Sequence, residues 1–317
     1  MQWKYTTSYR ESQCEKGEEE KTDVFLLLPS CGRICKYCNS IVCMVNYNVD
    51  RHILSVLHSK KDDRMLEKWT IPFPAPNRRE RRMVYVYIPD AAMENPKLRF
   101  PVLYMFDGHN LFLDSDATYG KSWGLKEYLD EHQTPIIVVG VDCNHRLPNG
   151  RLMEYSPYDF DYKGPVEGRG ERTMEWYTKV LKPGIDRRYP TLRGRANTFI
   201  GGSSMGGLMS LYAVLRYNHV YSRAAALSPS IWVASDKLHA LVDEAALKPG
   251  TVVYMDYGQK ELKNHRGMLG DFAAFSAHLM EKGVLVNTRI VPGGTHCEAS
   301  WEKQISFFMD TLLYKQD

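Results

Sequence analysis

The sequence predicts an α/β fold with a mostly parallel central sheet and helices on both faces. Apolar runs at residues 101–106 and 135–141 are continuous rather than alternating, which is typical of strands covered on both faces by helices. From about Arg82 onward, strand-like runs alternate with helix-like segments. This order predicts β–α–β units, and such units build a parallel sheet.

Local composition predicts the individual elements. Aromatic and β-branched residues crowd residues 83–88 just before Pro89, which indicates an edge or early strand. A helix over residues 172–181 is expected to end before Pro183, because proline has no N–H to donate. The other strands are expected at residues 101–106, 135–141, 197–201, 224–227, 252–255 and 286–291, and the other helices at residues 205–217, 267–282 and 301–313.

Residues 65–317 are therefore expected to form the α/β domain, and residues 1–64 a poorly ordered extension. In the extension, charged clusters alternate with short apolar pieces and show no helix or strand period. Two interpretations stay open for it. Either it is a genuine part of the protein, or the reading frame has been extended too far upstream of Met65.

Composition limits the classes of partner. The 317 residues are 44% apolar and 25% charged, which suits one large core with an appendage. A net charge of +3 is too small to recruit nucleic acid or an anionic membrane. No apolar run approaches the ~18 residues that span a bilayer, and the N-terminus lacks a secretory pattern. We expect a cytoplasmic protein that acts on a small molecule, with no nucleic-acid or membrane partner.

Ser204 is the predicted nucleophile. It lies in the segment Gly202-Ser203-Ser204-Met205-Gly206, between a predicted strand and a predicted helix. A sharp turn at such a junction lifts the serine side chain above the sheet, and glycines avoid clashes with neighbouring backbone. The pentapeptide alone is common, so the interpretation depends on this setting and on residues further along the chain.

A serine hydroxyl needs a base to accept its proton and a carboxylate to orient that base. His296 follows the last predicted strand on a glycine-rich loop, at the edge where catalytic loops gather in such sheets, and is the predicted base. The loop after residues 252–255 offers two acids, Asp256 at the strand end and Glu261 beyond it. Either carboxylate could orient an imidazole, and a purely structural role is open for each.

Two backbone amides are expected to bind the oxyanion of an acyl transition state. Met205, directly after the nucleophile, supplies the first. The second is expected from the loop that follows the strand at residues 101–106, with His109 or Asn110 as the contributor. The side chains of Asp107 and Asn110 could equally stabilise that turn.

Four segments resemble the putative esterase family of α/β-hydrolases, also called esterase D-like: residues 102–112, 154–157, 201–207, and 293–296 followed by Trp301. The resemblance spans residues 69–313 and implies an α/β-hydrolase fold. Members include feruloyl, acetyl-xylan and siderophore esterases, S-formylglutathione hydrolases and mycolyltransferases. The family usually places its triad acid in a Gly-x-x-Asp/Glu segment, which residues 258–261 match, so the resemblance favours Glu261 over Asp256. Members commonly carry Gln where His109 stands, which leaves the backbone role intact but alters the pocket.

The resemblance leaves the ester open, because variable loops select the acyl and alcohol groups. Trp123 and Trp232 are candidates to line a sugar or phenolic site, although such aromatic residues are more often part of a core. Residues 144–170, which include Arg146 and Arg151, form either a pocket wall or lid or an ordinary solvated loop.

The expected activity is hydrolysis of a small carboxylic ester, such as an acylated carbohydrate or a phenolic ester, through an acyl-enzyme at Ser204. This chemistry needs no cofactor and no metal. Two alternatives stay open: transfer of the acyl group to an alcohol by the same fold, and a non-catalytic binding module. The presence of Ser204, His296 and an acid argues against the binding module.

Five of the seven cysteines lie near the N-terminus: Cys14, Cys31, Cys35, Cys38 and Cys43. The spacing of Cys31, Cys35 and Cys38 resembles the [4Fe–4S] motif of radical S-adenosylmethionine enzymes, but the barrel that such enzymes need is missing. Structural zinc is a further alternative, for which the spacing is irregular. An odd count without a secretory signal predicts reduced thiols, and we expect no bound metal.

Overall fold

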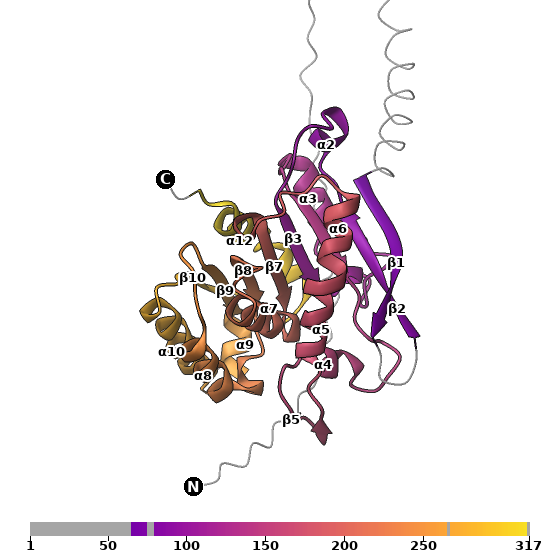
Figure 1. Cartoon of the computed structure of the whole chain (residues 1–317). Coiled ribbons are helices and arrows are strands. Elements are labelled where there is room, and N and C mark those ends of the chain that lie inside the picture. Colours follow the sequence, from indigo (N-terminus) through magenta and orange to yellow (C-terminus); the bar gives the residue numbers. More distant parts are fainter. Residues whose placement is uncertain (1–64, 75–78, 265–266, 316–317) are drawn as a thin grey trace, which may run out of the picture. The chain divides into compact units, whose positions relative to one another are not determined.

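The computed structural model describes residues 65–74, 79–264 and 267–315 (Figure 1). The predictions for residues 1–64 and their cysteines lie outside this part of the chain. Within it, no helix combines the length and the apolar character needed to cross a bilayer.

An eight-stranded sheet forms the centre of the fold, in the order β1-β2-β4-β3-β7-β8-β9-β10. The first two strands are antiparallel to their neighbours, and every later pairing is parallel. This arrangement confirms the predicted mostly parallel sheet. The strands are β1 (Leu66–Pro74), β2 (Arg79–Tyr87), β3 (Val102–Phe106), β4 (Ile137–Val141), β7 (Thr198–Ser203), β8 (Arg223–Leu227), β9 (Val252–Gly258) and β10 (Leu285–Val291), and a separate hairpin pairs β5 (Phe160–Asp161) with β6 (Pro165–Val166).

Helices connect these strands and cover the sheet (Figure 1). The α-helices are α2 (Asp90–Glu94), α3 (Leu125–Glu131), α4 (Gly150–Glu154), α5 (Gly170–Trp176), α6 (Lys182–Arg188), α7 (Met205–Arg216), α8 (Ser235–Glu244), α9 (Gln259–Asn264), α10 (Met268–Glu281), α11 (Glu298–Glu302) and α12 (Ile305–Leu313). Shorter helical turns are η1 (Gly108–Asn110), η2 (Tyr177–Leu181), η3 (Arg195–Asn197) and η4 (Ile231–Val233).

Alternate residues of β3 contribute to two separate hydrophobic clusters. Val102, Tyr104 and Phe106 pack in a cluster with residues of α7, α8 and α10, whereas Leu103 and Met105 pack with residues of α3 and α12. Successive side chains of a strand point to opposite faces, so the two clusters lie on the two faces of the sheet. Helices therefore cover both faces, as the continuous apolar runs predict.

Three element boundaries differ from the sequence predictions. The helix expected to end before Pro183 continues as α6. Lys182 N–H donates to Tyr177 O in the π-helical turn η2, and Pro183 is the second residue of α6, where a proline is tolerated in the first turn. Strand β9 continues three residues beyond Met255, so Asp256 lies within the strand rather than after it. The expected helix over residues 301–313 is divided into α11 and α12.

The loop after β3 lies against β4 through two glycines. An ideal Cβ on Gly108 would lie 2.5 Å from the carbonyl carbon of Gly140 and 2.7 Å from Val141 N. Such distances are below any ordinary nonbonded contact, so only glycine allows the two backbones to approach this closely. The close approach fixes the position of η1 at the carboxyl end of the sheet.

We predict that Gly108→Ala lowers the free energy of unfolding by about 1–3 kcal/mol, because backbone atoms must shift to make room for the methyl group. Urea denaturation followed by circular dichroism measures the change. Gly184→Ala is the matched control, since Gly184 lies inside α6 with no atom within 4 Å of an added Cβ. The control should gain stability by about 0.5–1 kcal/mol, and an equal gain in Gly108→Ala would contradict the packing argument.

Candidate active site

Ser204 occupies the sharp turn between β7 and α7. Its backbone has φ 58° and ψ −121°, a conformation that is rare for a residue with a side chain. Two backbone hydrogen bonds hold it there: Ser204 N–H donates to Leu227 O at 2.9 Å, and Ser230 N–H donates to Ser204 O at 3.0 Å. A Cβ on Gly202 would lie 3.0 Å from the carbonyl carbon of Gly206, so the glycines let the two arms of the turn approach.

A buried carboxylate orients the imidazole of His296. Glu261 Oε2 lies 2.7 Å from His296 Nδ1, while Oε1 accepts hydrogen bonds from Gly258 N–H and Ser228 Oγ–H, each at 2.8 Å. Burial alone would raise the pKa of Glu261, but His296 and these donors outweigh it and hold the pKa below its usual value. The carboxylate therefore stays charged and can stabilise an imidazolium.

Trp301 supports this pair from the side. Its Nε1–H donates to Ser228 Oγ at 3.1 Å, and its ring meets the His296 ring edge-on with centroids 5.1 Å apart. Trp123 packs behind Trp301 at 5.7 Å and is only 2% exposed. The structure thus places Trp123 in the core behind the site, where little of its ring is open to a ligand.

Asp256, the second candidate acid, has different partners from His296. It lies inside β9 at 1% exposure, with Tyr254 O–H donating to Oδ2 at 2.9 Å and Ser228 N–H donating to Oδ1 at 3.1 Å. Burial raises the pKa of Asp256 to about 7, against the lowering effect of these donors. Of the two candidate acids, the described contacts bring Glu261 to His296.

The loop after β3 is tied to the serine turn by a partly buried ion pair. Arg151 from α4 makes a two-pronged contact with Asp107, Nε to Oδ1 at 2.8 Å and Nη2 to Oδ2 at 2.7 Å, and Nη2 also reaches Ser203 O at 3.4 Å. Asp107 has a left-handed φ of 56°, and its N–H donates to Tyr155 Oη. Burial would raise the pKa of Asp107, but Arg151 outweighs it and the pKa is lowered. The sequence analysis expected Arg151 in a pocket wall, a lid or a solvated loop. In the structure it joins the loop after β3 to the end of β7.

The expected oxyanion donors differ in their surroundings. Met205 is the first residue of α7, so its N–H belongs to the first turn, where amides have no partner inside the helix. His109 N–H donates to Asp142 Oδ1 at 3.0 Å, and Asn110 N–H donates to Asp107 O at 2.9 Å. The Asn110 side chain also reaches Glu298 at 3.2 Å and so links η1 to α11, which begins two residues after His296.

Sequence reasoning missed the segment that follows β8. Ser228 joins Glu261 to Trp301, and Ser230 Oγ lies 3.5 Å from Ser204 Oγ. A Ser-Pro-Ser run directly after a buried strand, at the edge where the other site loops gather, was the available signal. Trp232 follows in η4, is 47% exposed, and contacts the rings of Phe160 and Tyr162.

The sheet order, the helices on both faces and the strand-to-helix turn at Ser204 define an α/β-hydrolase. Residues 76–312 match the family described as "Putative esterase". This match covers most of the chain, so the protein belongs to the putative esterase family and is a hydrolase of the esterase class. That membership confirms the resemblance seen in the sequence.

Individual relatives are more distant. YbbA, an uncharacterized protein of Bacillus subtilis (strain 168), is 27% identical over 196 residues, which are 58% of this chain and 72% of YbbA. An IroE-like serine hydrolase from Shewanella oneidensis has a TM-score of 0.60 at 19% identity, covering 78% of this chain and 79% of that protein. The siderophore hydrolase EstA from Aspergillus nidulans has a TM-score of 0.59 at 17% identity, covering 78% and 95%. At these identities the solved structures establish the shared fold.

The carboxyl group of Asp256 should make stability depend on pH. Its pKa of about 7 in the folded protein lies above the value of about 3.9 for an aspartate in an unfolded chain. The folded state holds this proton more tightly, so its stabilising contribution is complete below about pH 4 and is lost as the pH rises through about 7. We predict that Asp256→Asn, which cannot ionise, raises the urea midpoint at pH 8 and flattens its change between pH 5 and 8.

Asp236→Asn serves as the control, because Asp236 is exposed in the first turn of α8. It should keep the pH dependence of the wild-type protein. If Asp256→Asn keeps it as well, the carboxyl group does not titrate as its burial requires.

Proposed function

We propose that the protein is a serine carboxylic-ester hydrolase in which Ser204 attacks the acyl carbon, His296 transfers the proton and Glu261 orients His296. The observation that carries the proposal is the 2.7 Å contact between His296 Nδ1 and a buried, charged Glu261. The three residues follow β7, β9 and β10, whose carboxyl ends meet at one edge of the sheet. An acid, a base and a serine in a nucleophile turn are the groups that acyl transfer requires.

In the proposed reaction, His296 Nε2 accepts the Ser204 proton as Oγ bonds to the acyl carbon. The resulting imidazolium is stabilised by Glu261, and it then gives its proton to the leaving alcohol as the ester bond breaks. Water, activated by the same imidazole, releases the acid from the acyl-enzyme. Because Glu261 Oε1 is held by two further donors, Oε2 keeps its orientation toward Nδ1 through both steps.

We assign the oxyanion to the backbone amides of Met205 and His109. The first lies in the opening turn of α7, where the helix dipole also favours negative charge. The second donates to Asp142 Oδ1 in the structure, so a substrate oxyanion must compete with this carboxylate for it. The Asp107–Arg151 pair holds the two segments in register.

For the substrate we propose a small ester with an aromatic acyl or alcohol group. Trp232 offers a half-exposed ring two residues beyond Ser230, whose amide donates to the backbone of Ser204. Phe160 and Tyr162 extend this aromatic surface. The structural relative named as a siderophore hydrolase is consistent with ester chemistry on this fold.

We predict that a fluorophosphonate labels Ser204 and that Ser204→Ala abolishes labelling and lowers kcat at least about 10³-fold, because the attacking oxygen is lost. Mass spectrometry of the labelled peptide and p-nitrophenyl acetate hydrolysis measure both effects. Ser203→Ala, one residue earlier in the same turn, is the control and should be labelled at Ser204. Labelling of the wild type at another residue would refute the assignment.

Glu261→Gln should lower kcat about 10²- to 10⁴-fold with little change in KM, because a neutral amide cannot stabilise the imidazolium. Asp256→Asn is the matched control, since it neutralises the neighbouring buried acid that contacts Tyr254 instead of His296. Steady-state kinetics of both variants separate the two candidates. Equal losses, or a larger loss in Asp256→Asn, would reverse the choice of acid.

Trp232→Ala should raise KM for a feruloyl ester about 5- to 150-fold, as expected for the loss of roughly 1–3 kcal/mol of aromatic contact. The KM for p-nitrophenyl acetate should change much less, because acetate has no ring to pack. A parallel increase for both esters would show that Trp232 supports the fold rather than the aromatic group.

A further inference from the structure

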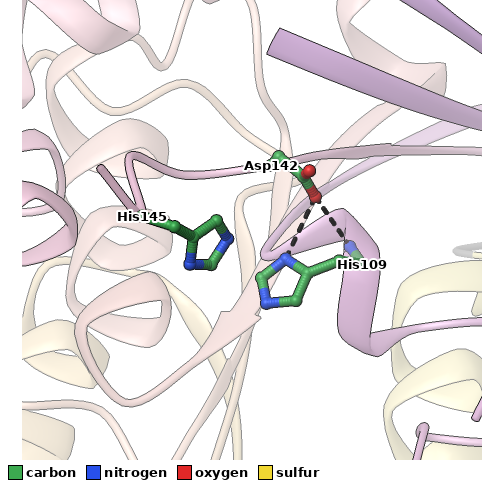
Figure 2. Close-up of side chains that lie close together, drawn as sticks. All are labelled: His109, Asp142 and His145. Carbon is green, nitrogen blue, oxygen red and sulfur yellow. Dashed lines mark hydrogen bonds and ion pairs between the residues drawn. The ribbon is translucent and has the colours of Figure 1, made fainter. Parts of the chain in front are cut away.

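A cluster of two histidines and one aspartate lies beside the proposed oxyanion loop. Among the described residues, His109, Asp142 and His145 bring one potential ligand atom each within 4.8 Å of one another. His109 belongs to η1 after β3, and the other two follow β4, the next strand of the sheet. Figure 2 shows the His145 ring facing the His109 ring, with Asp142 above the latter.

We propose that His109, Asp142 and His145 form a binding site for one divalent transition-metal ion of the zinc type. Two imidazole nitrogens and one carboxylate oxygen are a common protein ligand set for such ions, with water completing the coordination. Neither the family match nor the ester chemistry requires this site. It lies beside the serine machinery and overlaps with it at His109, whose backbone amide donates to Asp142.

The distances suit a single ion. His109 Nδ1 lies 3.0 Å from Asp142 Oδ1, close to the separation of two ligands that each lie about 2.0–2.2 Å from a shared Zn²⁺. Every ligand atom of the cluster lies within 4.8 Å of the other two, whereas ligands that share a tetrahedral Zn²⁺ lie about 3.4 Å apart, so the more distant atoms must approach by up to about 1.5 Å. His145 is exposed and can supply that movement by side-chain rotation, whereas His109 is buried and fixed.

The second nitrogen of His109 has a hydrogen-bonding partner, as the second nitrogen of metal-binding histidines usually does. His109 Nε2 lies 3.0 Å from Thr118 Oγ1, a hydroxyl that can accept a hydrogen bond from Nε2–H. In that tautomer the Nδ1 lone pair faces Asp142 Oδ1, and only a cation between them makes this contact favourable. The competing arrangement, with Nδ1–H donating to Asp142 and Thr118 donating to Nε2, fits the same distances and needs no metal.

The rings of His109 and His145 are in direct contact. The two imidazole rings are 4.5 Å apart and nearly perpendicular, with an interplanar angle of 87°. They come from different loops, so neither the chain connection nor a shared helix forces them together. Cys143 Sγ also lies 3.5 Å from His145 Nε2, but Cys143 is buried and lies outside the three-residue cluster.

The test is calorimetric titration of Zn²⁺ into chelator-treated full-length protein. Wild type should bind one equivalent of Zn²⁺ that is lost, or weakened at least about tenfold, in both His145→Ala and Asp142→Asn. His219→Ala, an exposed histidine after α7, is the control and should bind as wild type does. Binding that is absent from the wild type, or equal in wild type and both cluster variants, overturns the proposal and supports the metal-free histidine tautomer.

The seven cysteines are a competing set of ligands, so the donor atoms must be identified. Substituting Co²⁺ for Zn²⁺ gives an absorption spectrum, and the spectrum of wild type minus that of His145→Ala isolates the ion in question. Visible d–d bands without a near-ultraviolet thiolate band support imidazole and carboxylate ligands. A thiolate band in this difference assigns the ion to cysteine and overturns the proposal. Neither measurement uses an ester, so its result is independent of the hydrolase assignment.

Discussion

The partly buried ion pair between Asp107 and Arg151 ties together three segments of the candidate site. It joins the end of β3 to α4, and through Ser203 O it reaches the strand that carries the serine turn. A buried charge whose partner is removed costs several kcal/mol, so the pair strongly restricts the relative positions of these segments. The left-handed backbone at Asp107 and the Gly108–Gly140 contact lie next to this ion pair in the chain. Together with it they set the position of η1 at the end of β3.

Two acidic side chains near the end of β9 have pKa values that their surroundings shift in opposite directions. Glu261 gains His296 and two further donors, and its pKa falls, whereas Asp256 is enclosed by the sheet and its pKa rises to about 7. They are five residues apart in the sequence, and both contact Ser228, one through its hydroxyl and the other through its amide. Glu261 therefore stays charged beside His296, whereas Asp256 holds its proton up to near neutral pH.

Much of this architecture could be predicted from sequence because the parallel strands are continuous apolar runs. Strand β1 escaped prediction because it includes Pro72 and Pro74, which central strands avoid but an edge strand such as β1 accepts. The continuation of the helix through Pro183 was not predicted, because composition gives no signal for a π-helical turn. The proposed nucleophile and base, Ser204 and His296, could be located from their order and glycine-rich loops, whereas the residues alone left Asp256 and Glu261 open as the acid and only the family resemblance favoured Glu261. The contacts of Ser228 and the pairing of Arg151 with Asp107 could not be predicted, because they join segments far apart in the chain.

The stack of His296, Trp301 and Trp123 has an optical consequence. An imidazolium ring quenches the fluorescence of an adjacent indole more strongly than a neutral imidazole does, and Trp301 meets His296 at 5.1 Å. Trp123 lies 5.7 Å from Trp301, close enough for excitation to pass between the two indoles. Trp301 is therefore placed to report the charge on His296 through its share of the tryptophan fluorescence, without an added dye.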